Sequence, residues 1–203
     1  MKIGPKYKIA RRLQAAIFEK TQTPKYALSL ARKERSGGKK GRTKQKSEFG
    51  LQLMEKQKAR LTYGLSEKQF RNYVDKALKA EVPVQKLFAL LETRLDNVLF
   101  RSGLAKTRSA ARQAASHGHA TVNGRRVNVP SIALRAGDVV GLRSSSAASP
   151  LFGEVSERIK TLTPSIWLKA DAETKTATVD GAPAYVPGEQ LFDLGVVIEF
   201  YNR

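Results

Sequence analysis

Two strands and a tight turn are encoded in Ala120-Thr121-Val122-Asn123-Gly124-Arg125-Arg126-Val127-Asn128-Val129. Apolar and polar residues alternate on both sides of the Asn-Gly pair, with the period of two that a half-buried strand requires. Asn-Gly favours a two-residue hairpin turn because both residues tolerate positive φ. The stretch therefore predicts an antiparallel hairpin.

A helix is predicted directly before this hairpin. Thr107 is a suitable N-cap and Gly118 a suitable C-terminal stop. Arg108 and Arg112 are four residues apart and share one side of the helix. Small residues form the packing side, namely Ala110, Ala111, Ala114 and Ala115.

Three more helices are predicted upstream. The first covers Leu51 to Leu61 and stops near Gly64. The second begins after Ser66 with a capping box, and the third follows a proline that suits a first helical turn. The third helix is expected to break near Glu92, which we take as a domain boundary.

The other segments carry weaker signals. Residues 1–47 are basic and irregular, with one short helical stretch around Ala10 to Lys20. A surface loop is expected at Ser144 to Ser149, followed by a short helix at Pro150 to Lys160. Further strands are expected at Asp138 to Arg143, Ser165 to Ala170, Thr176 to Val179 and Val196 to Tyr201.

These elements predict an α+β protein with a helical N-terminal domain, then a helix pair and hairpin, and a small antiparallel sheet. We divide the chain into a basic extended segment at 1–47 and a helical domain at 48–92. A helix-pair and hairpin domain follows at 93–143, and a β-rich segment at 144–203 completes the fold.

Charge is distributed unevenly along the 203 residues. Lys and Arg number 37 against 18 Asp and Glu, for a net charge of +19. The net charge is +15 over 1–92, +7 over 93–143 and −3 over 144–203. A basic surplus of this size favours a polyanion as partner, nucleic acid first and a membrane surface second. No run of about 18 apolar residues or secretory signal occurs, so we expect no membrane partner.

Residues that commonly carry catalysis are scarce. The chain has no cysteine, and His117 and His119 have no nearby carboxylate to orient them or share a metal. Neither a Gly-rich phosphate loop nor a Gly-x-Ser-x-Gly elbow is present. We therefore expect no enzyme, no metal and no cofactor. His117 either complements the helix dipole or contacts a phosphate beside Arg112.

Cations concentrate within 94–143, where Asp96 and Asp138 are the only acids. Hydroxyls at a helix N-terminus add donors where a phosphate binds well. We predict an RNA-binding surface here, with a plain solvated surface as the alternative. The candidate residues are Arg94, Arg101, Lys106, Thr107, Arg108, Ser109, Arg112, His117, Arg125 and Arg126.

A second set of RNA-binding candidates lies in the first 92 residues. Some of these residues follow the side of the helix after Ser66 that is opposite its apolar stripe. The candidates are Lys6, Lys8, Arg11, Arg12, Lys56, Lys58, Arg60, Lys68, Arg71 and Asn72.

Several of these stretches resemble a known family. Glu92-Thr93-Arg94-Leu95-Asp96-Asn97-Val98-Leu99-Phe100-Arg101-Ser102-Gly103, together with 107–113, 116–117 and 122–128, looks like the S-four RNA-binding domain. That domain also occurs in pseudouridine synthases and in a tyrosyl-tRNA synthetase. The upstream stretches 50–58, 63–64 and 67–73 resemble the N-terminal domain of the fourth small-subunit ribosomal protein family of bacteria. Similarity recurs at 166–168 and 197–201.

The resemblance implies a structural constituent of the small ribosomal subunit, in the cytoplasm or in an organellar ribosome. It implies primary binding to a multi-helix junction in the 5′ domain of small-subunit rRNA, which nucleates assembly, and a contribution to translational accuracy. The implied protein partners are the fifth and third small-subunit proteins, with no homo-oligomer. Some members bind zinc through N-terminal cysteines, which this chain lacks.

A basic loop near Arg42 is implied to lie where mRNA enters the small subunit, and to help open mRNA structure. The cations that could do this are Lys39, Lys40, Arg42, Lys44 and Lys46. Repression of its own operon through the messenger stays open. Two rival functions also stay open: an RNA-targeting module of an rRNA-modifying enzyme, and a nonspecific nucleic-acid-binding protein.

Overall fold

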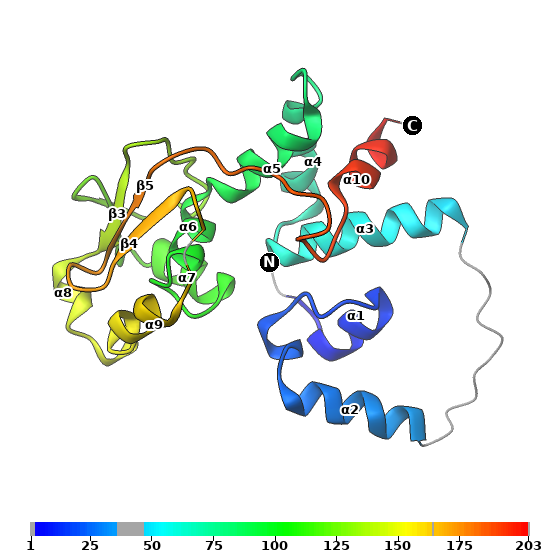
Figure 1. The fold of residues 1–203 in the computed structure, drawn as a ribbon, viewed down its shortest axis with the longest axis horizontal. Helices are drawn as coiled ribbons and strands as arrows, with labels where there is room; N and C mark the ends of the chain where they lie inside the picture. Colours follow the sequence, from blue (N-terminus) through cyan, green and yellow to red (C-terminus); the bar gives the residue numbers. More distant parts are fainter. Residues whose placement is uncertain (1–2, 36–46, 164, 203) are drawn as a thin grey trace. The chain divides into compact units, whose positions relative to one another are not determined.

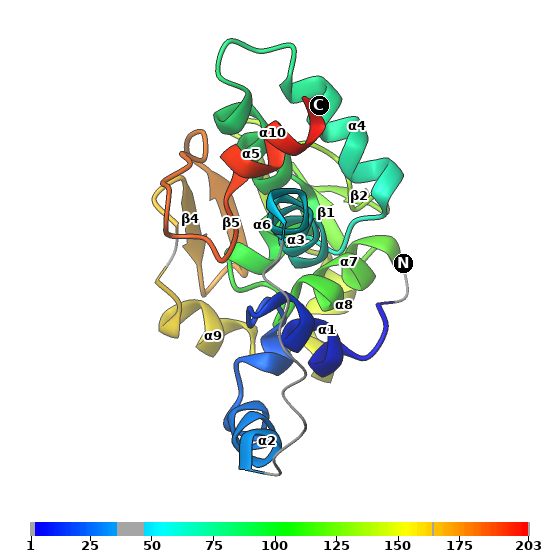
Figure 2. The same cartoon turned by 90° about the vertical axis from the view of Figure 1, so that its right-hand side faces the viewer.

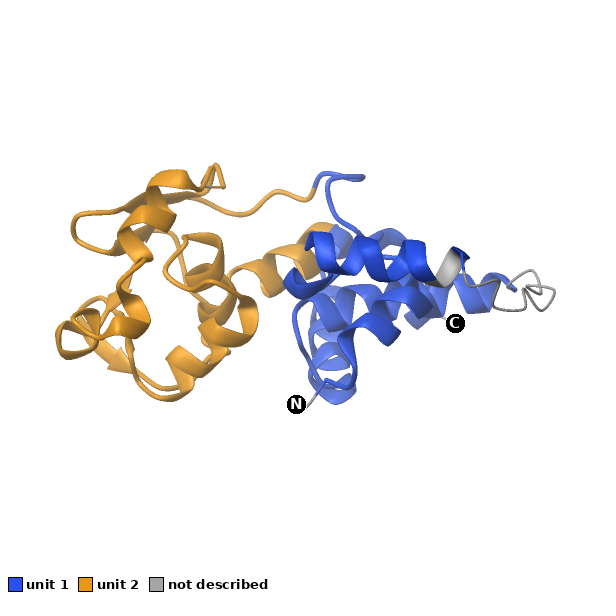
Figure 3. Ribbon diagram, turned by 90° about the horizontal axis from the view of Figure 1, so that it is seen from below, with its two compact units in different colours: residues 1–84, 186–203 blue, residues 85–185 orange. Residues whose placement is uncertain are grey.

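A computed structural model describes residues 3–35, 47–163 and 165–202. The chain forms two compact units, drawn in different colours in Figure 3. Unit 1 comprises Met1–Val84 and Val186–Arg203, and unit 2 comprises Gln85–Tyr185. Unit 1 is thus built from both ends of the chain, and the predicted segment 144–203 is divided between the units.

The N-terminal part of unit 1 contains more helix than its sequence indicated. Helix α1 covers Lys6–Leu13, a 3₁₀ turn η1 covers Glu19–Thr21 and helix α2 covers Pro24–Arg35. Helix α1 ends because Gln14 adopts a left-handed φ of 54°. The predicted helix from Ala10 to Lys20 was therefore wrong in position, and α2 was missed.

A small apolar cluster holds these N-terminal helices together. It consists of Ala10, Leu13, Ile17, Phe18 and Tyr26, all of them buried. The rings of Tyr7 and Tyr26 add a contact with centroids 5.1 Å apart. Ala10, Leu13 and Ile17 follow a helical spacing, but Gln14 ends α1 among them, so only the contacts reveal this core.

Helices α3 (Glu48–Thr62) and α4 (Glu67–Ala77) confirm the helices predicted for this region. The Ser66 hydroxyl accepts the backbone N–H of Gln69, whose side chain accepts the N–H of Ser66, which is the expected capping box. Gly64 has a φ of 61°, a conformation that glycine adopts without strain, and separates the two helices.

Residues 196–201, predicted as a strand, belong instead to helix α10 (Leu194–Tyr201). The Asp193 carboxylate caps this helix by accepting the N–H groups of Gly195 and Val196. Helix α10 packs on α3, as Figures 1 and 2 both show. Burial of three apolar residues against α3 outweighs the strand propensity of the β-branched run; these residues are Leu194, Val197 and Ile198.

Unit 2 places a helix pair against a sheet. Helix α5 (Pro83–Glu92) leads into α6 (Leu95–Arg101) and α7 (Arg108–Ser116), and α6 packs on α7. The break after Glu92 and the Thr107 cap are confirmed. The backbone of α6 is also anchored from a distant loop, because the N–H of Asp96 donates to the carbonyl of Pro130.

Five antiparallel strands form the sheet in the order β2-β1-β3-β5-β4. The predicted hairpin is confirmed, with Ala120 opposite Val127 and Val122 opposite Arg125. The strands are β1 (Ala120–Val122), β2 (Arg125–Val127), β3 (Val139–Leu142), β4 (Leu168–Asp171) and β5 (Thr176–Val179).

Between β3 and β4 lie three short helical elements. They are α8 (Ser144–Ala147), η2 (Pro150–Phe152) and α9 (Val155–Thr161). The predicted helix near 150–160 is thus present in two pieces. The loop predicted at Ser144 to Ser149 was wrong in part, because its first four residues form a helical turn with Ser146 buried.

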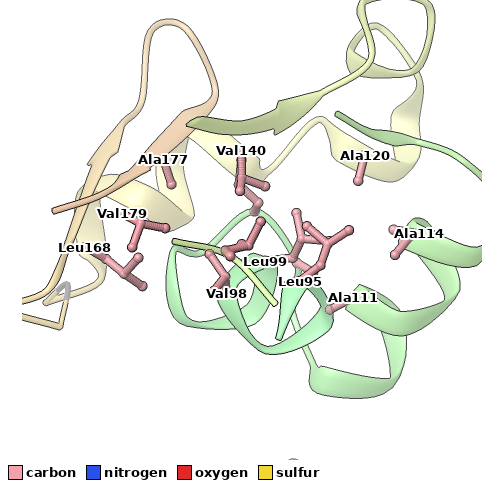
Figure 4. Close-up of a cluster of buried hydrophobic side chains, with 14 of the residues drawn as sticks. Leu95, Val98, Leu99, Ala111, Ala114, Ala120, Val140, Leu168, Ala177 and Val179 are labelled. Carbon is pink, nitrogen blue, oxygen red and sulfur yellow. The ribbon is translucent and has the colours of Figure 1, made fainter. Parts of the chain in front are cut away.

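The core of unit 2 lies between the helix pair and the sheet. Side chains of α6 and α7 point toward those of the strands, as Figure 4 shows. The single tryptophan, Trp167, is 9% exposed and belongs to this cluster. Its fluorescence can therefore report the folding of unit 2.

Helix α10 provides the first testable prediction. Leu194→Ala removes a fully buried side chain from unit 1 and should cost about 3 kcal/mol of unfolding free energy through lost burial and a residual cavity. Denaturant unfolding followed by far-UV circular dichroism measures the loss. The control is Leu191→Ala, the same substitution at a residue that is 50% exposed. Equal losses from both variants would contradict the packing described for α10.

Candidate nucleic-acid interface

Asp96 is a buried carboxylate at the start of α6 that accepts bonds from two arginines. Arg94 donates Nε to Oδ1 at 3.0 Å and Nη2 to Oδ2 at 2.8 Å. Arg112, on α7, donates Nε and Nη2 to Oδ2 at 2.8 and 2.6 Å. Asp96 and Arg94 are each 3% exposed, whereas the Arg112 side chain is 28% exposed. One carboxylate therefore joins α6 to α7.

Glu92 and Asn97 hold two further arginines of the predicted set. Arg101 makes a bidentate pair with the Glu92 carboxylate at 2.9 and 3.0 Å. The Asn97 amide donates to Glu92, and its carbonyl accepts Nε of Arg108 at 2.9 Å. Arg108 also stacks over the Phe100 ring, 4.4 Å from its centroid. Such ion pairs fix side-chain geometry more than they add stability, because desolvation offsets most of the attraction.

The N-terminus of α7 carries the predicted hydroxyls. The Thr107 hydroxyl accepts the N–H of Ala110 at 3.1 Å, so it is engaged as the helix cap. It also lies 3.0 Å from the hydroxyl of Ser109. Lys106 and Ser109 are exposed beside this end of the helix. The cluster suits a phosphate because the helix dipole adds positive potential here.

The hairpin presents Arg125 and Arg126 as an exposed pair on β2. Arg126 Nη2 lies 3.5 Å from the carbonyl of His117, which is itself exposed after α7. The structure thus brings the hairpin arginines next to the end of α7. His119 has a different environment, because its Nδ1 lies 2.9 Å from the Ser146 hydroxyl and its ring packs edge-on against Phe152.

Asp138, the other acid of this region, stabilises the turn before β3. The backbone N–H of Arg135 and the side-chain amide of Asn123 both donate to its carboxylate and lower the pKa of Asp138. The carboxylate thereby connects the hairpin turn to β3. The Arg135 side chain is exposed, and this cation was not among the predicted RNA-binding residues.

Lys56 and Arg60, predicted to bind RNA, lie on the side of α3 that contacts α4 and α10. Lys56 is 7% exposed and its Nζ lies 2.7 Å from Oε1 of Glu67. Arg60 Nε lies 3.4 Å from the same carboxylate, and the Tyr201 hydroxyl donates to it at 2.9 Å. Glu67 therefore joins three elements of unit 1.

The electrostatics of this cluster are set by Glu67. Partial burial raises the pKa of Glu67. Hydrogen bonds from Lys56 and Tyr201, together with the nearby cations, lower it by more, so the pKa lies below its ordinary value. Burial and the bond to Glu67 raise the pKa of Tyr201 above its ordinary range. The tyrosine stays protonated and keeps donating to the carboxylate.

The remaining unit 1 candidates differ in exposure. Lys68, Arg71 and Asn72 are exposed on α4, opposite its buried stripe, as the periodicity indicated. Lys58 pairs with Glu55 at 2.6 Å. On α1, Lys8 and Arg12 are exposed and Lys6 and Arg11 are half-buried.

Several exposed cations were not selected from the sequence. Lys76 follows Asn72 by one helical turn on α4, and helical periodicity places it on the same exposed side, although it was not among the predicted RNA-binding residues. Arg143 follows β3, where no motif marks it. The predicted mRNA-contacting cations from Lys39 to Lys46 lie outside the described residues.

Metal ligands and long apolar helices would indicate other kinds of site within residues 3–35, 47–163 and 165–202. Among these residues no group of three or more His, Asp or Glu side chains could hold a metal ion. No helix in the same ranges has the length and apolar character to span a membrane. The clustered cations are thus the main chemical feature of the surface described above.

Comparison with known proteins identifies both parts of the chain. Residues 1–92 match the model of the ribosomal protein S4/S9 N-terminal domain, and residues 93–140 match the S4 domain. The chain is 43% identical over 187 residues to small ribosomal subunit protein uS4 of Pelotomaculum thermopropionicum, covering 91% of this chain and 89% of the relative. It is 41% identical to uS4 of Heliobacterium modesticaldum, covering 98% of both chains. It is 39% identical to uS4 of Aquifex aeolicus, covering 99% of this chain and 98% of the relative.

The Glu67 cluster predicts a pH dependence. Because the folded-state pKa of Glu67 is lowered, its ionised form stabilises the fold above the unfolded-state value near 4.5, and this contribution is lost as pH falls through the folded-state pKa. Glu67→Gln should therefore lower stability at neutral pH, by at most about 1 kcal/mol because Glu67 is half exposed. The difference from wild type should shrink as pH falls through the lowered folded-state pKa.

Thermal melts of both proteins between neutral pH and pH 3 measure this difference. Glu81→Gln is the matched control, since Glu81 is exposed in the same unit. A pH-independent difference for Glu67→Gln would show that the carboxylate charge is not what stabilises the cluster.

Proposed function

The chain belongs to the small ribosomal subunit protein uS4 family, and from this premise we propose that it is a structural, non-enzymatic constituent of the small subunit that binds small-subunit rRNA. The observation that carries the proposal is the match to uS4 relatives along almost the whole of both chains. Both parts of the relatives, the N-terminal domain and the S4 domain, are present here.

Charge supports rRNA as the partner. The first 143 residues carry a net charge of +22, whereas the last 60 carry −3. Each phosphate neutralised by Lys or Arg releases counterions, which gives affinity without reading a base sequence. The acidic final third fits a protein neighbour better than RNA, and we propose the fifth and third small-subunit proteins as its partners.

Recognition in unit 2 is proposed to depend on shape. Arginines of α6 and α7 are positioned by internal contacts: Arg112 with Asp96, Arg101 with Glu92 and Arg108 with Asn97. Fixed cations fit one spacing of phosphates and not others, which suits folded RNA, where proteins mostly read backbone shape. A junction of several rRNA helices in the 5′ domain is the proposed target.

Individual candidates take different proposed roles. Arg125, Arg126, Lys106 and the exposed face of α4 are proposed to contact phosphates directly, because they are exposed. Arg94 and Lys56 are buried in ion pairs, so we propose that they support neighbouring residues. Lys58 and Arg60 are intermediate, each with a carboxylate close by.

Further parts of the proposal follow from the same placement on rRNA. Early binding would nucleate subunit assembly and influence translational accuracy. The basic run containing Lys39, Lys40, Arg42, Lys44 and Lys46 is proposed to contact mRNA where it enters the subunit. Repression of its own messenger would use the same RNA-binding surface.

Binding across a salt series tests the proposal. The purified chain should prefer a 5′-domain rRNA fragment over tRNA and duplex DNA by about 10³ or more. The slope of log affinity against log salt should correspond to roughly six to ten neutralised phosphates. Equal affinities for all three polymers would instead indicate a nonspecific basic protein.

The hairpin arginines give a second test. Replacing Arg125 and Arg126 together by alanine should weaken rRNA binding and lower the salt slope by about 1.5 to 2, because two phosphate contacts are lost. Melting temperature should not change, since both side chains are exposed. Lys169→Ala removes an exposed cation from β4 and should leave binding unchanged. Equal losses from both changes would contradict a specific role for the hairpin.

A further inference from the structure

Asp96 is an unexpected residue in a surface that binds RNA. Residues 93–143 contain nine cations and two acids, and Asp138 is accounted for by the turn that it stabilises. Asp96 lies among the arginines proposed for RNA binding, where a negative charge opposes the approach of phosphate. Its burial also carries a desolvation cost. A residue with two such disadvantages requires an explanation beyond packing.

The contacts of Asp96 are unusually complete. Four N–H groups donate to its two oxygens, two from Arg94 and two from Arg112. Its own backbone N–H donates to the carbonyl of Pro130 at 3.0 Å, so the carboxylate is held from both sides. Arg94 is almost fully buried, which makes the Asp96–Arg94 pair a fixed part of the interior.

Arg112 differs from Arg94 in two respects. It comes from α7, sixteen residues away in sequence, and more than a quarter of its side chain reaches the surface. Two of its nitrogens contact Oδ2 of Asp96, which fixes the plane and position of the guanidinium. An arginine held in this way has already lost the rotamer freedom that a free side chain would lose on binding.

We propose that Asp96 is a positioning residue for RNA binding, whose negative charge strengthens the affinity for RNA by holding Arg112 in its binding geometry. The proposal rests on the proposed function, because it requires that unit 2 bind RNA. Asp96 itself would not touch RNA and would act through Arg112.

Simple electrostatics and positioning predict opposite results. If only net charge mattered, neutralising Asp96 would raise the charge of the protein by one and strengthen RNA binding slightly. If positioning matters, neutralisation frees Arg112 and weakens binding despite the more favourable charge. The sign of the change therefore distinguishes the two explanations.

The test compares Asp96→Asn with Glu173→Gln in the full chain, using the 5′-domain rRNA fragment across a salt series. Both variants gain one unit of positive charge, and Glu173 is exposed between β4 and β5. We expect Asp96→Asn to weaken rRNA binding about 3- to 10-fold, the loss that follows from one side chain becoming free to move. Glu173→Gln should bind like wild type. Equal or tighter binding by Asp96→Asn, with its fold intact, would overturn the proposal.

Fold integrity is checked in the same samples. Trp167 lies in the core of unit 2, so its fluorescence shows whether Asp96→Asn is folded at the temperature of the binding assay. In NMR spectra, the Nε–H resonance of Arg112 should shift and exchange faster in Asp96→Asn than in wild type. An unchanged Arg112 resonance would contradict the positioning role even if affinity fell.

A second comparison covers the case in which Asp96→Asn does not fold, because it leaves Arg94 buried without its carboxylate. The double variant Asp96→Asn with Arg94→Gln has the wild-type net charge and no buried arginine at position 94. It is compared with Arg94→Gln alone, in which Asp96 still holds Arg112. Weaker rRNA binding by the double variant supports the proposal, and equal binding contradicts it.

The wild-type protein separates this inference from the proposed function. If wild type prefers rRNA and Asp96→Asn is not weaker, the positioning role fails and the function stands. If wild type shows no preference among rRNA, tRNA and duplex DNA, the proposed function itself fails.

Discussion

The structure of unit 2 depends on two buried carboxylates that sit at the helix break after α5. Asp96 and Glu92 bind arginines from α6 and α7 and so fix how the helix pair meets. Removing Asp96 would take away the carboxylate that pairs with the buried Arg94, which costs far more than the net contribution of the pair. The same bonds set the direction in which the arginines reach the surface. Packing and the proposed RNA recognition would therefore be controlled by the same few atoms.

Unit 1 is also organised around a carboxylate, but there the contacts mainly connect helices of the unit. Glu67 gathers Lys56, Arg60 and Tyr201, and in doing so connects α4 to α3 and to the last helix. Here the cations are used mainly to hold the unit together, and the exposed side of α4 is left for a ligand. In both units a carboxylate at a junction of helices organises several cations or hydroxyls around it.

Local signals in the sequence predicted much of this fold. Caps such as Thr107 and Ser66, the Asn-Gly turn and the apolar periodicity of α4 act within a few residues, so they can be read directly. The α10 helix could not be predicted in this way, because contacts with α3 override the strand propensity of its β-branched residues. The burial of Arg94 was equally hidden, since its backbone forms a bridge with Ala133, a residue far along the chain. Composition identified the cations but could not separate those that face solvent from those that build the interior.

Unit 1 contains two segments that are far apart in sequence, which affects the order in which the two units can fold during synthesis. A chain is made from its N-terminus at about 5 to 20 residues per second, and domains generally fold as soon as their residues are available. Residues 85–185 are complete before Val186–Arg203 exist, so unit 2 can fold while α3 still lacks α10. Met1–Val84 are translated before unit 2 but belong to the unit that is completed after it. A premature stop before α10 would damage that unit and leave the residues of unit 2 complete.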